Sequence, residues 1–211
     1  MNNLILLGGG GHCESVIELI RFQGRYNILG VLDPSFDEGL KKVMDIPVLG
    51  KDEDIPKYVK KGCQFVITVG QIKSSKIREK LFNEVKMYGG ELPTITAKTA
   101  YVSKDSVIGE GTVIMDYCFV NVSTNVGDAC ILNTGSILEH GCSVGDFTHV
   151  STRVVLNGDV SCGKSCFIGS GTIVNQDINI GDGCIVASGS LVRKNIGANS
   201  TVAGNPIKNI E

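Results

Sequence analysis

The sequence lacks tryptophan, and it is poor in charged residues (20%) and in aromatic residues (6%). No apolar run approaches the ~18 residues that a membrane span requires. The first apolar run ends at Gly8 and does not have the layout of a secretory signal. The formal net charge of -2 disfavours nucleic acid as the main partner. We therefore expect a cytoplasmic protein that neither inserts into a membrane nor binds nucleic acid.

Glycine and cysteine, by contrast, are abundant. The 27 glycines among 211 residues follow no G-X-Y period, which excludes a collagen-like helix. The hydrophobic fraction of 42% is enough for a packed core and argues against disorder. Because nothing suggests export, we expect the eight cysteines to be reduced rather than joined in disulfides.

A six-residue repeat occupies the second half of the chain. From Val102 to Val192, every sixth residue is Val, Ile or Leu at fifteen of sixteen positions, and Cys162 is the exception. The residue two places earlier is Ala, Ser, Thr or Cys at thirteen of the sixteen positions. No proline lies between Thr94 and Asn205, as unbroken strand ladders require. The period predicts a parallel β-helix with three hexapeptides per coil and with the aliphatic and small residues inside.

The same repeat assigns places to glycine and cysteine. Glycine or asparagine often follows the inward aliphatic residue, as at Gly127 and Gly145, and we expect the chain to turn there with positive φ. Six cysteines occupy inward positions, namely Cys118, Cys130, Cys142, Cys162, Cys166 and Cys184. Buried cysteine acts as a small hydrophobic residue. We therefore interpret Cys162-x-x-x-Cys166 as core packing rather than as a metal site, despite its ligand-like spacing.

The first ninety residues alternate between strands and helices. The predicted elements are strands at 3–7, 27–32 and 65–69 and helices at 12–23 and 74–88. The predicted apolar stripe of the second helix consists of Ile77, Leu81, Val85 and Tyr88. This alternation favours a parallel sheet covered by helices, which is a Rossmann-like α/β domain. Pro93 marks the boundary, so we expect one domain at 1–92 and a second at 93–211.

The loop Gly8-Gly9-Gly10-Gly11-His12 follows the first predicted strand and opens the first helix. Backbone N–H groups at such a helix start can bind phosphate. Asp33 ends the second predicted strand, where it can accept hydrogen bonds from a ribose or a base. The G-x-G-x-x-G fingerprint fails because Cys13 takes its third glycine position, which favours a nucleotide diphosphate over a hydride-transfer cofactor. The alternative is a glycine turn without a ligand.

The chain has three histidines, and two of them, His140 and His149, lie in the repeat. The register places His140 near a coil corner. His149 immediately precedes inward Val150, so its own side chain should face outward. Histidine is the commonest general base near neutral pH, and lysine and arginine are almost absent from this region. We expect His140 to be a catalytic base.

Several segments together resemble the sugar O-acyltransferase family, which contains bacterial nucleotide-aminosugar N-acetyltransferases and sialic acid O-acetyltransferases. These segments are residues 8–12, 31–33, 69–71, 132–134, 138–140, 145–151 and 203–206. The likeness covers essentially the whole chain. In overall layout it is closest to the enzymes that acetylate a UDP-linked 4-amino-4,6-dideoxy sugar.

The resemblance implies an all-β left-handed parallel β-helix after the Rossmann-like domain, a homotrimer, and acetyl-CoA lying between neighbouring prisms without a metal. It implies that His140 is the base and that Asn133 sits beside the reacting centre. The residues implied to line the acetyl-CoA cleft are His149, Ser170 and Ser188, the two serines mainly through main-chain groups. Those implied to hold the nucleotide sugar are Gly10, Gly11, His12, Asp33 and Gly70.

One position departs from the family pattern. The catalytic histidine of these relatives is usually followed by Glu or Asp, which orients the imidazole, whereas here the next residue is Gly141. The reaction that we expect is direct acetyl transfer, with neutral His140 taking the proton of the acceptor amine and with His149 or a backbone amide stabilising the oxyanion. Two alternatives stay open: O-acetylation of a sialic-acid-type sugar, and a non-catalytic trimeric scaffold or sugar-nucleotide-binding protein, which Gly141 favours.

Overall fold

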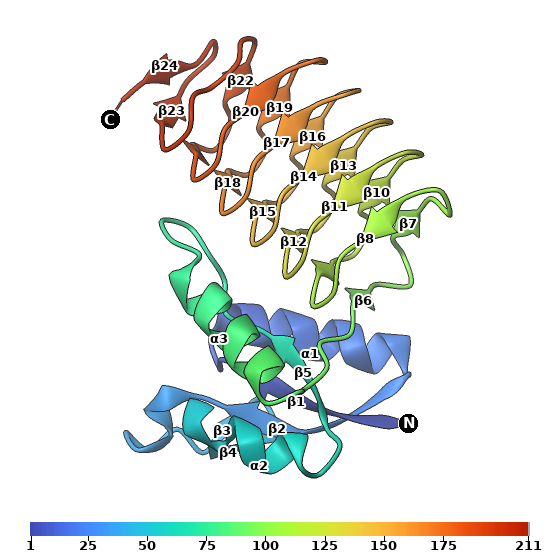
Figure 1. Ribbon diagram of the computed structural model, residues 1–211, viewed down its shortest axis with the longest axis vertical. Coiled ribbons are helices and arrows are strands. Elements are labelled where there is room, and N and C mark those ends of the chain that lie inside the picture. Colours follow the sequence, from blue (N-terminus) through green and yellow to red (C-terminus); the bar gives the residue numbers. More distant parts are fainter. Residues whose placement is uncertain (211) are drawn as a thin grey trace. The chain divides into compact units, whose positions relative to one another are not determined.

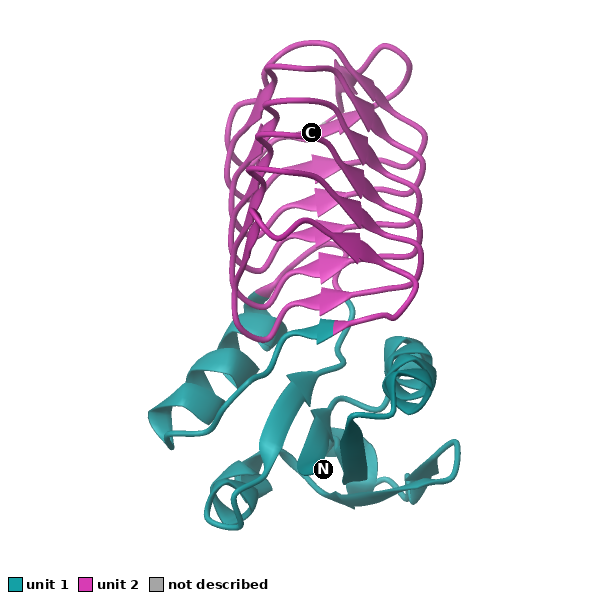
Figure 2. Ribbon diagram, turned by 90° about the vertical axis from the view of Figure 1, so that its right-hand side faces the viewer, with its two compact units in different colours: residues 1–70, 76–95 teal, residues 71–75, 96–211 magenta. Residues whose placement is uncertain are grey.

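The computed structural model describes residues 1–210, which form two compact units (Figure 2). The first unit comprises residues 1–70 and 76–95, and the second comprises residues 71–75 and the chain from 96 onward. Gln71 belongs to the second unit because its Nε2 donates to the Cys166 carbonyl oxygen at 3.2 Å. Its own carbonyl oxygen accepts from Nδ1 of His149 at 2.8 Å. The division at 1–92 expected from the sequence did not anticipate this segment.

The first unit is a five-stranded sheet with helices, in the strand order β3-β4-β2-β1-β5. Its elements are β1 (Asn2–Leu7), α1 (Gly11–Gln23), β2 (Tyr26–Leu32), β3 (Lys42–Val43), β4 (Ile46–Gly50), α2 (Ile55–Val59), β5 (Gln64–Ile67) and α3 (Lys76–Met87). All pairs are parallel except β3 with β4. Because β1 continues to β2 on one side and pairs with β5 on the other, the strand order reverses beside β1.

Helix α1 follows the spacing of its apolar residues. Cys13, Val16, Ile17 and Ile20 are buried on one side of it. The helix ends at Gly24, which adopts φ 67° and donates its N–H to the Ile20 carbonyl oxygen at 3.0 Å. Glycine suits this left-handed cap because it has no Cβ. The helix therefore ends two residues before β2 begins at Tyr26.

The second unit is a prism of stacked coils whose walls are three sheets, parallel throughout except for the final pair, β23 with β24 (Figure 1). The six-stranded face contains β7 (Tyr101–Val102), β10 (Phe119–Val120), β13 (Ile137–Leu138), β16 (Val155–Leu156), β19 (Ile173–Val174) and β22 (Leu191–Val192). The five-stranded face contains β8 (Val107–Ile108), β11 (Asn125–Val126), β14 (Ser143–Val144), β17 (Ser161–Cys162) and β20 (Asn179–Ile180). The eight-stranded face contains β6 (Ile95–Thr96), β9 (Val113–Ile114), β12 (Ile131–Leu132), β15 (His149–Val150), β18 (Phe167–Ile168), β21 (Ile185–Val186), β23 (Thr201–Ala203) and β24 (Lys208–Asn209).

Pairs among the strands β7 to β22 join residues 18 apart, which is three hexapeptides, so each of these coils repeats the side-chain pattern of the one before. Val120 pairs with Leu138, and Leu138 pairs with Leu156. All three aliphatic side chains are completely buried inside the prism. Small residues such as Ser136 and Cys142 are also completely buried and fill its corners. The inward register expected from the sequence is the one found.

The turn position expected from the sequence is wrong. Positive φ falls not on the residue after the inward aliphatic but on the third residue after it, for example at Gly141 (70°) and Asp159 (61°). The glycine that directly follows the aliphatic is needed for space instead. A Cβ at Gly127 would lie 2.7 Å from the Asp146 backbone nitrogen, and a Cβ at Gly109 would lie 2.4 Å from the Gly127 carbonyl carbon. Close approach of successive coils therefore selects glycine there.

No helix within residues 1–210 has the length and apolar character needed to cross a membrane.

Candidate functional site

The glycine loop lies where the first sheet can accept a ligand. Gly8 to Gly11 connect β1 to α1, Asp33 follows β2, and Gly70 follows β5. These three strands are neighbours, and the strand order reverses beside β1. Open α/β sheets bind ligands outside the carboxyl ends of their strands at such a reversal. Five residues predicted to hold the nucleotide sugar, namely Gly10, Gly11, His12, Asp33 and Gly70, thus gather at one end of one sheet.

The Asp33 carboxylate accepts hydrogen bonds from the glycine loop and from the turn after β2. Its Oδ2 accepts the N–H of Gly9 at 2.6 Å, and its Oδ1 accepts the N–H of Ser35 at 2.8 Å. Gly8 adopts φ 103°, and a Cβ there would lie 2.5 Å from Cγ2 of Val69, so the loop passes close to the end of β5. A Cβ at Gly10 would meet nothing within 4 Å. The start of α1 therefore faces open space, as a phosphate-binding helix terminus requires.

His140 lies on the corner between the six-stranded and five-stranded faces, which we call the histidine edge. Its side chain is 60% exposed in the single chain. The ring rests against the next coil, where a Cβ at Gly158 would lie 2.5 Å from Cε1 and 2.7 Å from Nε2 of His140. Glycine at 158 thus leaves the space that the imidazole occupies.

Gly158→Ala is expected to lower kcat by about 100-fold, because the new methyl group displaces the imidazole and a 1 Å error in a catalytic group can cost ~10². Gly158 does not adopt positive φ, so alanine suits its backbone and the thermal midpoint should change little. Steady-state kinetics and thermal unfolding check both points. Unchanged kcat in a folded Gly158→Ala protein would show that the ring position does not matter.

The corner between the eight-stranded and six-stranded faces, which we call the serine edge, carries Asn133, Ser151, Ser170 and Ser188 in successive coils. Ser170 and Ser188 are exposed, and Oγ of Ser170 lies 2.9 Å from Oγ of Ser151. Within residues 1–210, the backbone N–H groups of Ser170 and Ser188 donate to no acceptor. They are available to the carbonyl oxygens of an extended ligand.

The third corner, between the five-stranded and eight-stranded faces, we call the aspartate edge. Three of its backbone N–H groups at the repeat position of Ser170 and Ser188 do have acceptors. There the N–H groups of Glu110, Asp128 and Lys164 donate to aspartate carboxylates of the next coil at 2.8–3.0 Å. The serine edge has no such carboxylates at Ser170 and Ser188. Open donors thus distinguish the serine edge from the aspartate edge and leave Ser170 and Ser188 able to bind a ligand.

His149 faces outward from the eight-stranded face, as its register predicts, yet its side chain is buried. Its Nδ1 lies 2.8 Å from the carbonyl oxygen of Gln71, and its ring meets Phe167 edge-on at 5.3 Å. A carbonyl oxygen only accepts, so the neutral ring carries its proton on Nδ1. Nε2 then accepts from Nδ2 of Asn133 at 3.4 Å. Asn133 is oriented for this because its Oδ1 accepts the N–H of Thr134 at 2.7 Å.

The site residues expected in the β-helix do not come together within one chain. His140 lies on the histidine edge, whereas Asn133, Ser170 and Ser188 lie on the serine edge. The whole six-stranded face separates the two edges. A site that uses both edges must therefore be completed by another copy of the chain.

The eight cysteines are free and buried. Burial raises the pKa of the Cys13 and Cys142 thiols to about 11. A hydrogen bond between the Cys162 and Cys166 side chains raises the pKa of Cys162 and lowers that of Cys166. Within residues 1–210, no group of three or more His, Cys, Asp and Glu side chains has an arrangement suited to a metal ion. The cysteines pack the interior.

We expect none of the eight thiols to react within minutes with a disulfide reagent at about pH 8 in the native protein, because the thiolate is the reacting species and these thiols are buried. All eight should react once the chain is unfolded in guanidinium. Counting reactive thiols by absorbance tests this. A fast-reacting thiol in the native protein would contradict a purely packing role.

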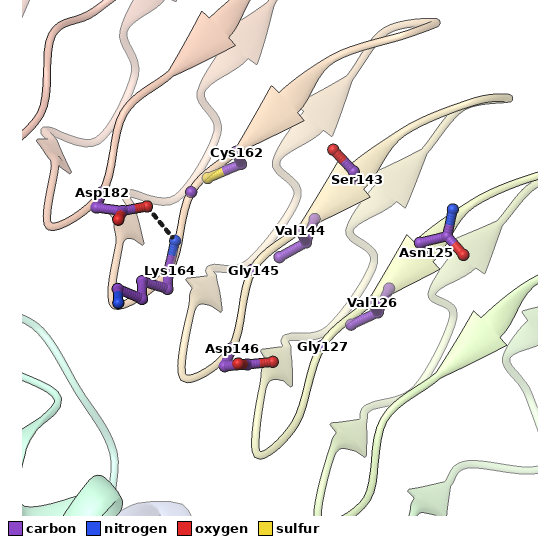
Figure 3. Close-up of a pocket in the computed structure, with 11 residues that line it drawn as sticks. Asn125, Val126, Gly127, Ser143, Val144, Gly145, Asp146, Cys162, Lys164 and Asp182 are labelled. Carbon is purple, nitrogen blue, oxygen red and sulfur yellow. Dashed lines mark hydrogen bonds between the residues drawn. The ribbon is translucent and has the colours of Figure 1, made fainter.

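A shallow hollow of about 460 Å³ lies on the five-stranded face and the aspartate edge (Figure 3). There the backbone N–H of Lys164 donates a hydrogen bond to Oδ1 of Asp182, as Figure 3 shows. None of the residues expected to form the site lines this hollow. The carboxylates of Asp146 and Asp182 in this hollow accept hydrogen bonds from backbone N–H groups of the preceding coil.

Two family profiles match the chain. Residues 3–85 match the PglD N-terminal domain, and residues 159–194 match the bacterial transferase hexapeptide (six repeats). A curated relative, UDP-N-acetylbacillosamine N-acetyltransferase of Bacillus subtilis (strain 168), is 34% identical over 120 residues, which are 54% of this chain. The match spans about half of that relative, 52% of its length.

Two solved structures are similar over the full chain. PerB from Caulobacter crescentus, in complex with CoA and GDP-perosamine, has a TM-score of 0.91 at 27% identity and covers 100% of this chain and 98% of its own. The acetyltransferase domain of PglB from Neisseria gonorrhoeae FA1090, in complex with acetyl coenzyme A, has a TM-score of 0.92 at 29% identity, with 100% of both chains covered. The predicted fold class, a Rossmann-like domain followed by a left-handed parallel β-helix, is confirmed.

Proposed function

We propose that the chain is a sugar acyltransferase with hexapeptide repeats, since residues 3–85 and 159–194 match the two family profiles, and that it transfers the acetyl group of acetyl-CoA to the amine of a nucleotide-linked 4-amino-4,6-dideoxy sugar. The observation that carries this proposal is the full-length similarity to a structure that holds both CoA and an amino-sugar nucleotide. The arrangement of the chain's own residues supports each half of the reaction.

The first unit supplies the nucleotide site. The open start of α1 can bind the diphosphate, and Asp33, at the end of β2, stands where a ribose or base would lie. Gly10, Gly11, His12 and Gly70 complete this group. We propose uracil as the base, in line with the Bacillus relative, although the Caulobacter structure holds a guanosine nucleotide.

The second unit supplies the surface for a homotrimer. Outward side chains of the six-stranded face are apolar, namely Tyr101, Phe119, Ile137, Val155, Ile173 and Leu191. Tyr101 is 55% and Ile173 44% exposed in the single chain. The five-stranded face turns Val107 outward in its first strand but polar side chains in the other four, namely Asn125, Ser143, Ser161 and Asn179. An exposed row of apolar side chains supports an interface on this face.

Threefold packing through the six-stranded face places the histidine edge of one copy beside the serine edge of the next. Acetyl-CoA then lies along the serine edge, with its amide carbonyls accepting the open N–H groups of Ser170 and Ser188. Asn133 and the buried His149 form the wall of this cleft, and His140 of the neighbouring copy faces the thioester.

The reaction in this site is a direct transfer. The neutral acceptor amine attacks the thioester carbonyl carbon, and His140 takes the proton that the nitrogen loses. Collapse of the tetrahedral intermediate breaks the C–S bond, and the imidazolium returns the proton to the departing CoA sulfur. The neutral His149 ring has its single N–H directed at Gln71. A backbone amide of the serine edge is therefore the oxyanion donor in this proposal.

A substrate panel tests the proposal. UDP-, GDP- and dTDP-linked 4-amino-4,6-dideoxy sugars should release CoA from acetyl-CoA and yield an N-acetylated product by mass spectrometry. Free and CMP-linked sialic acids are the matched hydroxyl acceptors. CoA release with the sialic acids alone would favour O-acetylation. A confirmed trimer that neither releases CoA from acetyl-CoA nor binds CoA would favour a scaffold.

A further inference from the structure

A carboxylate from the next coil lies beside the imidazole of His140. Oδ2 of Asp159 is 3.8 Å from Nδ1 of His140. Asp159 also donates its backbone N–H to the carbonyl oxygen of His140 at 2.9 Å. This bond belongs to the coil-to-coil ladder, so the fold itself fixes Asp159 next to His140. Within residues 1–210, His140 is the one basic side chain with a nitrogen within 4.0 Å of the Asp159 carboxylate.

Gly141 leaves the space that this carboxylate uses. Gly141 adopts φ 70°, and a Cβ there would lie 2.1 Å from Oδ1 of Asp159. A Cβ after His140 and the carboxylate of Asp159 in its present position therefore cannot both fit. The glycine at 141 and the aspartate at 159 are two parts of one arrangement.

We propose that Asp159 is the positioning residue for His140 and supplies, from the neighbouring coil, the carboxylate that the residue after the histidine does not provide. This inference rests on the proposed function. Asp159 accepts the Nδ1–H of His140, which fixes the tautomer with a lone pair on Nε2, the nitrogen that receives the amine proton. The 3.8 Å separation closes by rotation about side-chain bonds, since both side chains are 60% exposed and catalytic hydrogen bonds tighten when substrate binds.

Asp159→Asn tests the proposal, with Asp177→Asn as its matched control. Asn keeps the shape of the side chain and tolerates the positive φ of 61° at this position. Asp177 occupies the same place one coil further along the histidine edge, with φ 59° and its N–H bonded to Gly158, but it has no imidazole beside it. Asp159→Glu retains the charge at the same position.

We expect Asp159→Asn to lower kcat about tenfold to 100-fold with little change in KM for the nucleotide sugar. This is less than the ~10⁴ lost with a buried triad aspartate, because the pair is exposed. Asp159→Glu should recover part of the loss, and Asp177→Asn should match the wild type. Wild-type kcat in Asp159→Asn, an effect on KM alone, or equal losses in the Asn and Glu variants would each overturn the inference. A wild-type protein inactive on every amino sugar would instead overturn the proposed function.

Discussion

Replacing His140 with alanine is expected to lower kcat by about 10²–10⁴, the usual contribution of a general base. The expectation follows from the position of the ring. His140 is exposed on a corner, held against Gly158, and accompanied by Asp159. Of the three histidines, His149 is buried with its Nδ1 proton directed at a backbone carbonyl, and His12 lies in the first turn of α1 in the other unit.

The measurement is steady-state kinetics of the purified His140→Ala protein with acetyl-CoA and the best acceptor of the panel. Gln176→Ala is the control, because Gln176 has the same place in the repeat two coils further along the histidine edge and is exposed. It should leave kcat unchanged. Wild-type turnover by a folded His140→Ala trimer would remove His140 from the mechanism.

Ile173→Asp is expected to dissociate the trimer and to lower specific activity by at least about 100-fold, because separate chains no longer hold the base and the thioester in one geometry. Ile173 belongs to the apolar outer surface of the six-stranded face and is 44% exposed in the single chain. An aspartate there would bring unpaired carboxylates into an apolar interface, which is strongly unfavourable. The prism itself should remain folded, since the substituted side chain points away from its interior.

Asn179→Asp is the matched control, since Asn179 is the outward residue of the five-stranded face in the same coil. It adds the same charge to a face that stays exposed in the proposed trimer, so assembly and activity should be retained. Analytical ultracentrifugation and the CoA-release assay read out both variants. An Ile173→Asp protein that remains an active trimer would show that the six-stranded face is not the interface.

The fold was predictable because the β-helix has a simple geometric rule. Each strand of two residues turns one side chain inward. Because the six-residue repeat has no insertion, the equivalent side chain points inward in every coil. Leu138 and Leu156 show the result, because they pair directly and are fully buried. The glycine loop was predictable for a similar reason, since a strand that ends in glycines and leads into a helix has few alternative structures.

Other features depend on contacts between distant parts of the chain, which periodicity does not encode. Ile77, expected in the apolar stripe of α3, is 60% exposed, and so is much of Tyr88. Arg78 is buried instead, because its Nη1 donates to the Val69 carbonyl oxygen at 2.6 Å. The sequence also did not predict the short strands β3 and β4, because neither has a long apolar run.

In the candidate site, the sequence could indicate His140 but not what surrounds it. Asp159 is 19 residues away and reaches His140 only because a coil takes 18 residues. The burial of His149 was also unforeseen, since Gln71 covers it from a segment outside the repeat. The Asp159–His140 contact depends on how the coils stack, and the cover of His149 depends on where a connecting segment lies.

In the proposed trimer, each active site joins the histidine edge of one chain to the serine edge of another. Mixed trimers test it directly. His140→Ala removes the base from one edge, and Ser188→Trp places a bulky group on the other, exposed edge. Each homotrimer should be nearly inactive. Refolding the two variants together at equal amounts should restore about a quarter of the wild-type activity, because three quarters of random trimers contain one intact site of three. No recovery in trimers of confirmed mixed composition would contradict a site shared between chains.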